Sequence, residues 1–284
     1  MSPTKVYMSV DMEGIAGIAT FDQVVRGGHG YPRSQELMTL ETNAAIAGAF
    51  AGGATEVVVN DSHGTMDNLL HELLDPRARL VFGSPKLQCM AEGLTADCDV
   101  ALFVGYHAPA GGPGVLAHTF SSHFTGVRIN GVPVSEAEVN ALYAASLGVP
   151  VGLVTGDDVI CALAAERIPG VAVAEVKVAH GFAAANTLAP SVARDLVRDA
   201  AERAVRGHAS LPRPQLPGEL VLEVDLPLTI AAEMARGIPG VERVGDRTVR
   251  RTLSTTDEVI GIITVYYQLA AAAVAARQAL ISRI

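Results

Sequence analysis

Acidic and imidazole side chains follow three apolar runs of the sequence, at the points where these runs end. Asp11 and Glu13 follow the first run, at residues 6–10. His63 lies just past the second run and His107 just past the third. In open α/β sheets, ligands bind outside the carboxyl ends of the strands, so we expect these four side chains to be neighbours. Oxygen and nitrogen ligands of these types bind divalent metals, and several together suit two metals. The pattern therefore favours a metal-dependent hydrolase.

The spacing of Asp11 and Glu13 is compatible with a shared cation. In an extended backbone, residues i and i+2 point the same way, so both carboxylates can face one ion. Without a cation, two ionised carboxylates this close would repel each other. The alternatives are a solvated acidic loop for this pair, a turn with a bystander imidazole for His63, and a satisfied buried histidine for His107.

Two further residues are candidates for the same site. Glu136 stands at the start of a predicted helix, where the alternative is that its carboxylate only stabilises the helix dipole. His118 follows a glycine-rich segment, and a histidine beside a metal can act as an acid–base catalyst, an electrophile or a nucleophile. Asp61 and Asp157 either orient metal ligands through hydrogen bonds or are ordinary turn residues.

The charge balance and the apolar runs disfavour two classes of partner. The chain has 284 residues and a formal net charge of −9, from 21 basic and 30 acidic residues. Nucleic-acid binding needs a basic surface, so we expect no nucleic-acid partner. The longest unbroken apolar run, at residues 269–276, is shorter than the ~20 residues that span a bilayer, so we expect no membrane partner.

The cysteine content bears on the cellular compartment. The chain has three cysteines, an odd number, and their spacing matches no zinc finger or redox pair. No signal-peptide core precedes the first apolar run. We therefore expect a cytoplasmic protein with reduced cysteines.

Strand-like and helix-like segments alternate along most of the chain. Apolar residues at helical spacing predict a helix over residues 34–51, and a proline near the first turn predicts a short helix over 85–94. Asn130-Gly131 lies between two short strand-like runs and predicts a hairpin with a type I′ turn. The repeated β-then-α order predicts an α/β fold with a mainly parallel sheet flanked by helices.

A proline-rich stretch divides the chain. Residues 208–218 contain three prolines and predict a stiff linker. We assign residues 1–207 to an α/β metal-binding catalytic domain. Residues 219–284, with an alternating strand-like run at their start and a long helix at their end, are assigned to a smaller C-terminal α+β domain.

The ordered set of motifs resembles that of a known peptidase family. The segment Met8-Ser9-Val10-Asp11-Met12-Glu13-Gly14 resembles a signature of the D-aminopeptidase family, the M55 metallopeptidases. The segments at 59–63, 105–108, 130–136 and 156–158, together with Asn140 and the region of Lys177, also resemble motifs of that family. The resemblance runs from the N-terminus to about residue 200 and weakens beyond it.

This resemblance implies a specific activity and site. It implies a zinc peptidase, with two Zn²⁺ per subunit, that removes N-terminal D-residues such as D-alanine from short peptides. The residues that match the family's zinc ligands are Asp11, Glu13, His63, His107 and Glu136, with Asp11 as the bridge. His118 matches the family's catalytic histidine. The resemblance also implies a ring-like homo-oligomer, a decamer with its sites facing an inner channel.

The mechanism that we infer uses water activated by two metals, with His118 as proton donor or oxyanion stabiliser, or less favourably as nucleophile. One alternative is another two-metal hydrolase, such as a phosphoesterase or amidase. The second alternative is a non-catalytic protein in which metals stabilise an oligomer.

Overall fold

The chain folds into two compact units. The structure, a computed structural model, describes residues 3–282. The first unit comprises the chain up to Ala108, Pro113–Leu116 and Ala137–Leu216. The second unit comprises Pro109–Gly112, Ala117–Glu136 and the chain from Pro217 onward. The segment 117–136 therefore belongs to the second unit although it lies within the first half of the sequence.

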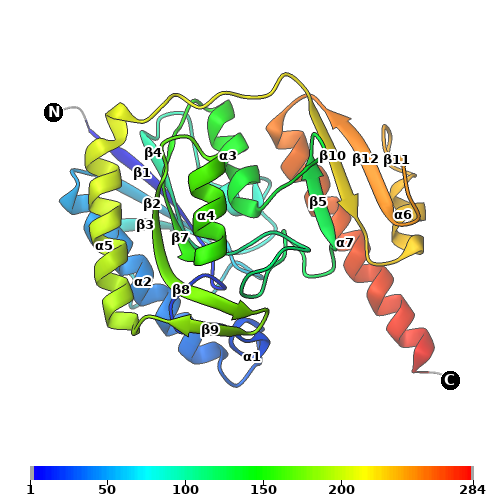
Figure 1. The fold of residues 1–284 in the computed structure, drawn as a ribbon, viewed down its shortest axis with the longest axis horizontal. Coiled ribbons are helices and arrows are strands. Elements are labelled where there is room, and N and C mark those ends of the chain that lie inside the picture. The colour runs from blue at the N-terminus through cyan, green and yellow to red at the C-terminus, as the bar shows by residue number, and fades with distance from the viewer. Residues whose placement is uncertain (1–2, 283–284) are drawn as a thin grey trace. The chain divides into compact units, whose positions relative to one another are not determined.

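A seven-stranded sheet forms the centre of the first unit (Figure 1). Its strand order is β3-β2-β1-β4-β7-β8-β9, and all neighbouring pairs are parallel except β8 and β9. The predicted α/β fold with a mainly parallel sheet is therefore confirmed. The strands are β1 (Lys5–Val10), β2 (Glu56–Asp61), β3 (Ala78–Val81), β4 (Val100–Tyr106), β7 (Val151–Asp157), β8 (Ala172–Gly181) and β9 (Ala184–Thr187).

Helices cover both faces of this sheet. α2 (Tyr31–Ala51) and α5 (Pro190–Gly207) pack against each other, and α4 (Asp158–Arg167) packs against β7 and β8. The connection β1-α2-β2 runs in one direction along the sheet and β7-α4-β8 in the other, so right-handed crossovers place α2 and α4 on opposite faces. Figure 1 shows α3 (Glu136–Ser146) beside α4.

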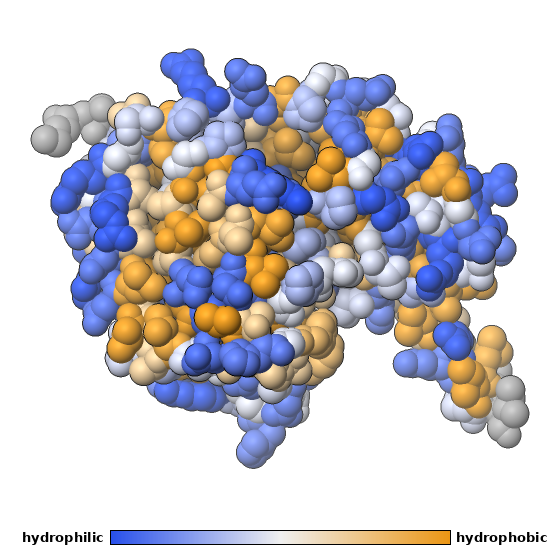
Figure 2. All heavy atoms as spheres, in the orientation of Figure 1, coloured by the Kyte–Doolittle hydropathy of each residue, from blue (hydrophilic) through white to orange (hydrophobic). Residues whose placement is uncertain are grey.

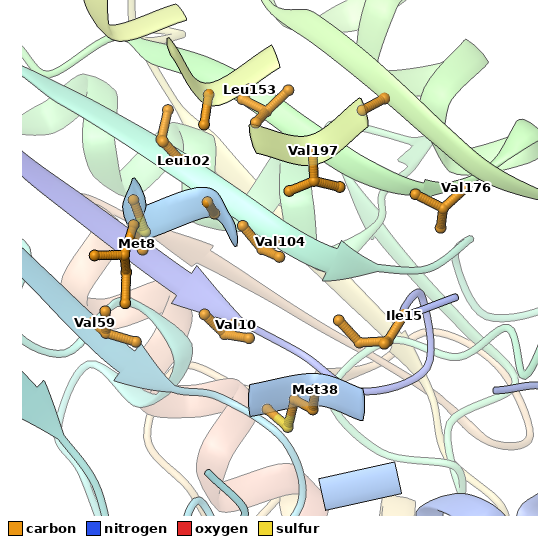
Figure 3. Close-up of a cluster of buried hydrophobic side chains, with 14 of the residues drawn as sticks. Met8, Val10, Ile15, Met38, Val59, Leu102, Val104, Leu153, Val176 and Val197 are labelled. Carbon is orange, nitrogen blue, oxygen red and sulfur yellow. The ribbon is translucent and has the colours of Figure 1, made fainter. Parts of the chain in front are cut away.

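Alternation along the strands separates an apolar face from a polar one. Met8 and Val10 of β1 lie with Val104 of β4 in the core beneath α2 and α5 (Figure 3). Successive strand residues point to opposite faces, so Ser9 and Asp11 lie on the other side of the sheet. Both of these polar residues are buried. The core thus holds β1 in place while its alternate residues are available for polar chemistry.

The second unit contains a five-stranded antiparallel sheet in the order β11-β12-β10-β5-β6. Asn130 and Gly131 have φ angles of 52° and 78° between β5 and β6, as the predicted type I′ turn requires. The elements of this unit are β5 (Gly126–Ile129), β6 (Val132–Pro133), β10 (Leu220–Asp225), α6 (Thr229–Ala235), β11 (Glu242–Arg243), β12 (Thr248–Leu253) and α7 (Thr256–Ile281). The short η2 (His208–Ser210) follows α5 and belongs to the first unit.

The last helix, α7, is long and apolar. It packs against α6, β10 and β12, and 39% of its most apolar 18-residue window is buried. Among the described residues it is the one helix whose length and composition would allow it to cross a membrane. The sequence prediction considered only the unbroken apolar run at 269–276, which is much shorter than the whole apolar helix. The absence of a membrane partner stays a prediction. Apolar residues are exposed near the end of α7 (Figure 2), where Leu280 is 63% exposed.

The structure differs from the sequence prediction in several short elements. Instead of a helix over 85–94 there is a single 3-10 turn, η1 (Cys89–Ala91). Gln88 and Cys89 leave the α conformation at this point, and Cys89 has a φ of 49°. The sequence reading also missed α1 (Phe21–Val24), β9 and β11. Each spans four residues or fewer, which is too short for a hydrophobic period to be recognised.

Glu41 and Lys177 are among the charged side chains that are buried within the first unit. Glu41 of α2 is 1% exposed, and its Oε2 accepts a hydrogen bond from the backbone of Ala16 at 3.2 Å. Burial raises the pKa of Glu41 to about 7, against the opposing influence of that hydrogen bond and of Lys177. Lys177 of β8 is 2% exposed, and burial lowers the pKa of its ammonium to about 8. These two groups attract each other across the interior.

We expect the Gly48→Ala substitution in α2 to destabilise the protein by about 1–2 kcal/mol. A Cβ atom at Gly48 would lie 2.1 Å from the backbone oxygen of Arg198 in α5, and overpacking of this kind costs more than the ~1 kcal/mol that alanine gains in helix propensity. Gly261→Ala in α7 is the matched control, because a Cβ there meets nothing within 4 Å. It should stabilise by up to about 1 kcal/mol. Urea denaturation of both variants provides the measurement, and a Gly48→Ala protein as stable as the parent would contradict the close packing.

We expect Glu41→Gln to change how stability depends on pH. A carboxyl pKa raised on folding means that the unfolded chain loses its proton first, so this group lowers the stability as the pH rises from about 4.5 to about 7. Glutamine removes this titration. The free energy of unfolding of the variant should therefore gain on that of the parent across this window, by up to about 3 kcal/mol, and the difference should level off above it. Denaturant titrations at several pH values give the free energy of unfolding of both proteins. If the pKa of Glu41 were not raised on folding, the two free energies would change with pH in parallel.

Candidate metal centre

Four of the predicted residues lie together at the carboxyl edge of the seven-stranded sheet. Asp11 and Glu13 follow β1, His63 follows β2, and His107 follows β4. β1 pairs with both β2 and β4 in parallel, which brings the three strand ends to the same edge. All four side chains are buried. The predicted juxtaposition is therefore present within the first unit.

Asp11 lies between the two imidazoles of this cluster. Its Oδ1 is 3.3 Å from Nδ1 of His63, and its Oδ2 is 3.2 Å from Nε2 of His107. Glu13 Oε2 is 2.9 Å from the same Nδ1 of His63. Asp11, Glu13 and His63 each offer one ligand atom, and these three atoms lie within 4.8 Å of one another. The arrangement can enclose a cation with both nitrogen and oxygen donors.

Backbone carbonyls fix the orientation of both histidine rings. Nε2 of His63 lies 2.7 Å from the carbonyl oxygen of Val24, at the end of α1. Nδ1 of His107 lies 3.0 Å from the carbonyl oxygen of Ala108. A carbonyl oxygen only accepts hydrogen bonds, so these ring nitrogens carry the hydrogen. The opposite nitrogen of each ring faces the carboxylates, which is how metal-binding histidines are usually held.

The electrostatics of the cluster favour a bound positive charge. Burial by itself would lower the pKa of His63, but the carboxylates of Glu13 and Asp11 raise it well above its ordinary value. Two buried carboxylates in contact with one imidazole thus attract a proton strongly. A divalent cation meets the same demand with more charge.

The close approach of β1 to β4 depends on two glycines. Gly105 has a φ of 73°, and a Cβ there would lie 2.3 Å from the backbone oxygen of Asp11. At Gly14 a Cβ would lie 2.1 Å from the backbone oxygen of Tyr106. The backbone of Gly14 donates a hydrogen bond to the carbonyl of Gly105 at 2.7 Å. A side chain at either position would push the loop that carries Asp11 and Glu13 away from β4.

Asp61 organises the turn that carries His63. Its Oδ2 accepts hydrogen bonds from the backbones of Asn68 and Leu69, at 2.6 and 2.7 Å. Its Oδ1 accepts from the side-chain amide of Asn68, which also donates to the carbonyl of His63 at 2.6 Å. Asp61 therefore holds His63 indirectly, through Asn68. The sequence analysis did not single out Asn68, which has no motif of its own.

Asp157 joins a helix start to the segment that leads toward His118. Its Oδ1 accepts from the backbone of Ile160 and caps α4. Its Oδ2 accepts from the backbone of Val115 at 2.8 Å. Leu116, next in the chain, has a φ of 53° and donates its backbone hydrogen to Phe182 at 2.7 Å. Both observations show a segment held tightly just before His118.

In the second unit, His118 lies close to Glu136. Its Nε2 is 3.8 Å from Oε1 of Glu136, and the side chain is 22% exposed. The same Oε1 accepts the backbone hydrogen of Phe120 at 2.5 Å. Phe120 has a φ of 58°, so His118 stands between two non-glycine residues, Leu116 and Phe120, in the left-handed region. Strain of this kind is found where the backbone must hold a side chain in place.

A buried polar network lies beside the four-residue cluster. The hydroxyl of Ser9 is 2.7 Å from those of Ser62 and Tyr106. Asn140 of α3 donates from its side chain to Tyr106 at 2.9 Å. These hydrogen bonds connect Ser62 and Tyr106, which directly precede His63 and His107, with Ser9, two residues before Asp11. The network fixes the ends of β1, β2 and β4 relative to one another.

Three comparisons with known proteins place the chain in one family. The model of the D-aminopeptidase family matches residues 4–265. The D-aminopeptidase of Bacillus subtilis (strain 168) is 40% identical over 247 residues, which cover 87% of this chain and 90% of that protein. The solved structure of the Zn-dependent D-aminopeptidase DppA from Bacillus subtilis, described as a self-compartmentalizing protease, matches with a TM-score of 0.90 at 38% identity, over 94% of this chain and 98% of that one. The chain therefore belongs to the D-aminopeptidase family, M55, of peptidases.

Proposed function

We propose that the chain is a zinc-dependent aminopeptidase that removes N-terminal D-residues, such as D-alanine, from short peptides or amides. The observation that carries this proposal is the position of Asp11 between His63 and His107, with Glu13 beside it. Family membership supports the reaction class. The solved Bacillus relative is described as Zn-dependent, which supports the choice of metal.

The donor set fits zinc. Zinc binds imidazole nitrogens and carboxylate oxygens, and His63, His107, Asp11 and Glu13 offer both kinds at one place. The two oxygens of Asp11 face different imidazoles. This division supports the finer proposal that two zinc ions bind in each subunit and that Asp11 bridges them.

We assign Glu136 to the same ligand set and His118 to catalysis. The family resemblance supports both roles, and so does the proximity of the two side chains in the second unit. The chain connectivity is also compatible with this assignment. Glu136 is bonded directly to Ala137 of the first unit, and His118 follows Leu116 of the first unit by two residues.

Each residue of the site has a distinct role in the proposed amide hydrolysis. Zinc in this site would polarise the scissile carbonyl and lower the pKa of a water molecule to about 7, as in known zinc enzymes. Asp11, Glu13, His63 and His107 would hold the metal. His118 takes a proton from the attacking water and delivers it to the leaving amine as the C–N bond breaks, while the oxygen of that water ends in the carboxylate of the released residue. Glu136 lies near this ring, with its Oε1 3.8 Å from Nε2 of His118.

We further propose that the chain forms a ring-like homo-oligomer, a decamer, with its sites facing an inner channel. The solved relative is described as self-compartmentalizing, which supports an enclosed assembly. The three cysteines are free and buried, which supports a reducing cytoplasm as its location. Sedimentation equilibrium of the purified protein tests the assembly.

Activity should require metal and should distinguish stereoisomers. We expect the protein to hydrolyse D-alanine amide faster than L-alanine amide, because the proposed substrates carry N-terminal D-residues. Chelation should lower the rate by at least about 100-fold, since the metal carries the carbonyl activation, and added zinc should restore it. Turnover that persists in metal-free protein would contradict the mechanism. Hydrolysis of an aryl phosphate in place of either amide would instead identify another type of two-metal hydrolase.

His118→Ala should lower kcat by about 10²–10⁴-fold, the usual contribution of a general acid–base group. Its zinc content should match that of the parent protein, because His118 is not assigned to the ligand set. His123→Ala, in the same segment of the chain, serves as the control and should keep kcat within a few-fold of the parent value. Metal analysis together with steady-state kinetics separates the two roles. Loss of zinc from the His118 variant would show that this residue is a ligand instead.

A further inference from the structure

The loop at residues 13–18, which begins with Glu13, is held by one buried ammonium group. Nζ of Lys177 donates hydrogen bonds to the carbonyl oxygens of Glu13, Ile15 and Ile18, at 2.5, 2.9 and 2.6 Å. An ammonium group has three N–H donors, so this one loop satisfies all of them. Lys177 comes from β8, more than 150 residues further along the chain. We name residues 13–18 the ligand loop.

A buried carboxylate also bonds to this loop, from a different element of the fold. Glu41 of α2 accepts the backbone hydrogen of Ala16, in the middle of the ligand loop. Gly14 is held in turn by the carbonyl of Gly105 at the end of β4. The loop therefore has anchors in α2, β4 and β8, and Gly17 is also bonded to Thr187 of β9 and Gln23 of α1. It contains no helix or strand of its own, so these contacts fix its path.

Lys177 also lies among the carboxylates of this region. Its electrostatic partners are Glu41, Asp157, Glu13 and Asp11. Asp11 and Glu13 repel each other when both are ionised, and this repulsion tends to open the turn between them. A fixed positive charge bonded to the carbonyl of Glu13 opposes that opening.

We propose that Lys177 is a positioning residue, which holds the ligand loop so that Asp11 and Glu13 converge on the metal. A lysine suits this task because three converging carbonyls match the three donors of an ammonium group. The planar guanidinium of arginine has its five donors in a fixed fork and does not match this geometry. The identity of the metal rests on the proposed function, whereas the anchoring of the loop does not.

The first test is the zinc affinity of Lys177→Met. Methionine fills a similar volume but leaves the three carbonyls without their donor. We expect the dissociation constant for zinc, measured by competition with a chromogenic chelator, to rise about 10–100-fold, the usual effect of removing a residue that orients metal ligands. Lys5→Met is the matched control, because Lys5 lies at the start of the same strand that Asp11 follows and its ammonium group bonds to Thr95 and Asp97, far from the ligand loop in the sequence. Its zinc affinity should stay within about three-fold of the parent value.

The second test needs no metal. Hydrogen exchange of the zinc-free proteins should be at least 10-fold faster in the ligand loop of Lys177→Met than in the parent, with β2 and α5 unchanged. Lys5→Met should leave exchange in the loop as it is. Glu41→Gln keeps a side-chain oxygen that accepts from Ala16, so its loop should also exchange at the parent rate.

Further variants test the role of Lys177 if the single substitution prevents folding. If Lys177→Met does not fold, Lys177→Met combined with Glu41→Gln removes both buried charges and keeps the side-chain oxygen that accepts from Ala16. This double variant should still show weak zinc binding and fast exchange. Lys177→Arg should not restore zinc affinity. Parent-like zinc affinity and parent-like exchange in any folded Lys177 variant would overturn the proposal. If the parent itself bound no zinc, the proposed function would fail, and the exchange measurement would still decide the role of Lys177.

Discussion

The concentration of carboxylates at one edge of the parallel sheet is the constraint on which the rest of the site depends. Asp11 and Glu13 are buried there, and their mutual repulsion must be offset by nearby positive charge or by donors. The fold supplies both. His63 and His107 face the carboxylate oxygens, and Lys177 bonds to the backbone of the loop behind them. These partners explain why buried imidazole and ammonium groups surround a short segment of a largely apolar unit.

The part of the site at the strand ends could be predicted from the sequence. Asp11, His63 and His107 each follow an apolar run, and the parallel order of β1, β2 and β4 brings the ends of such runs together. This inference needs only the strand pattern and the rule for α/β sheets. Glu136 and His118 were candidates from the residues alone, and the motif resemblance assigned them roles that stay predictions.

The supporting residues could not be predicted in the same way. Lys177 has the same position in the alternating pattern of β8 as the exposed Val173 and Glu175. The pattern of the strand therefore predicts that Lys177 faces solvent. It is buried because the ligand loop folds over it, and this is a tertiary effect. Glu41 likewise lies within a helix whose apolar spacing gives no sign of a buried charge. The local pattern gives the period of an element but not which distant segments of the chain fold over it.

The short helix α1 connects the four-residue cluster with the protein surface. The carbonyl at its end, on Val24, orients the ring of His63, while Phe21 at its beginning is 52% exposed and lies against Phe182 at a ring separation of 5.3 Å. Phe182 in turn accepts the backbone hydrogen of Leu116. A change at either of these solvent-facing aromatics can therefore move the carbonyl group that orients the His63 ring. Related enzymes can diverge in metal affinity in this way without exchanging any ligand.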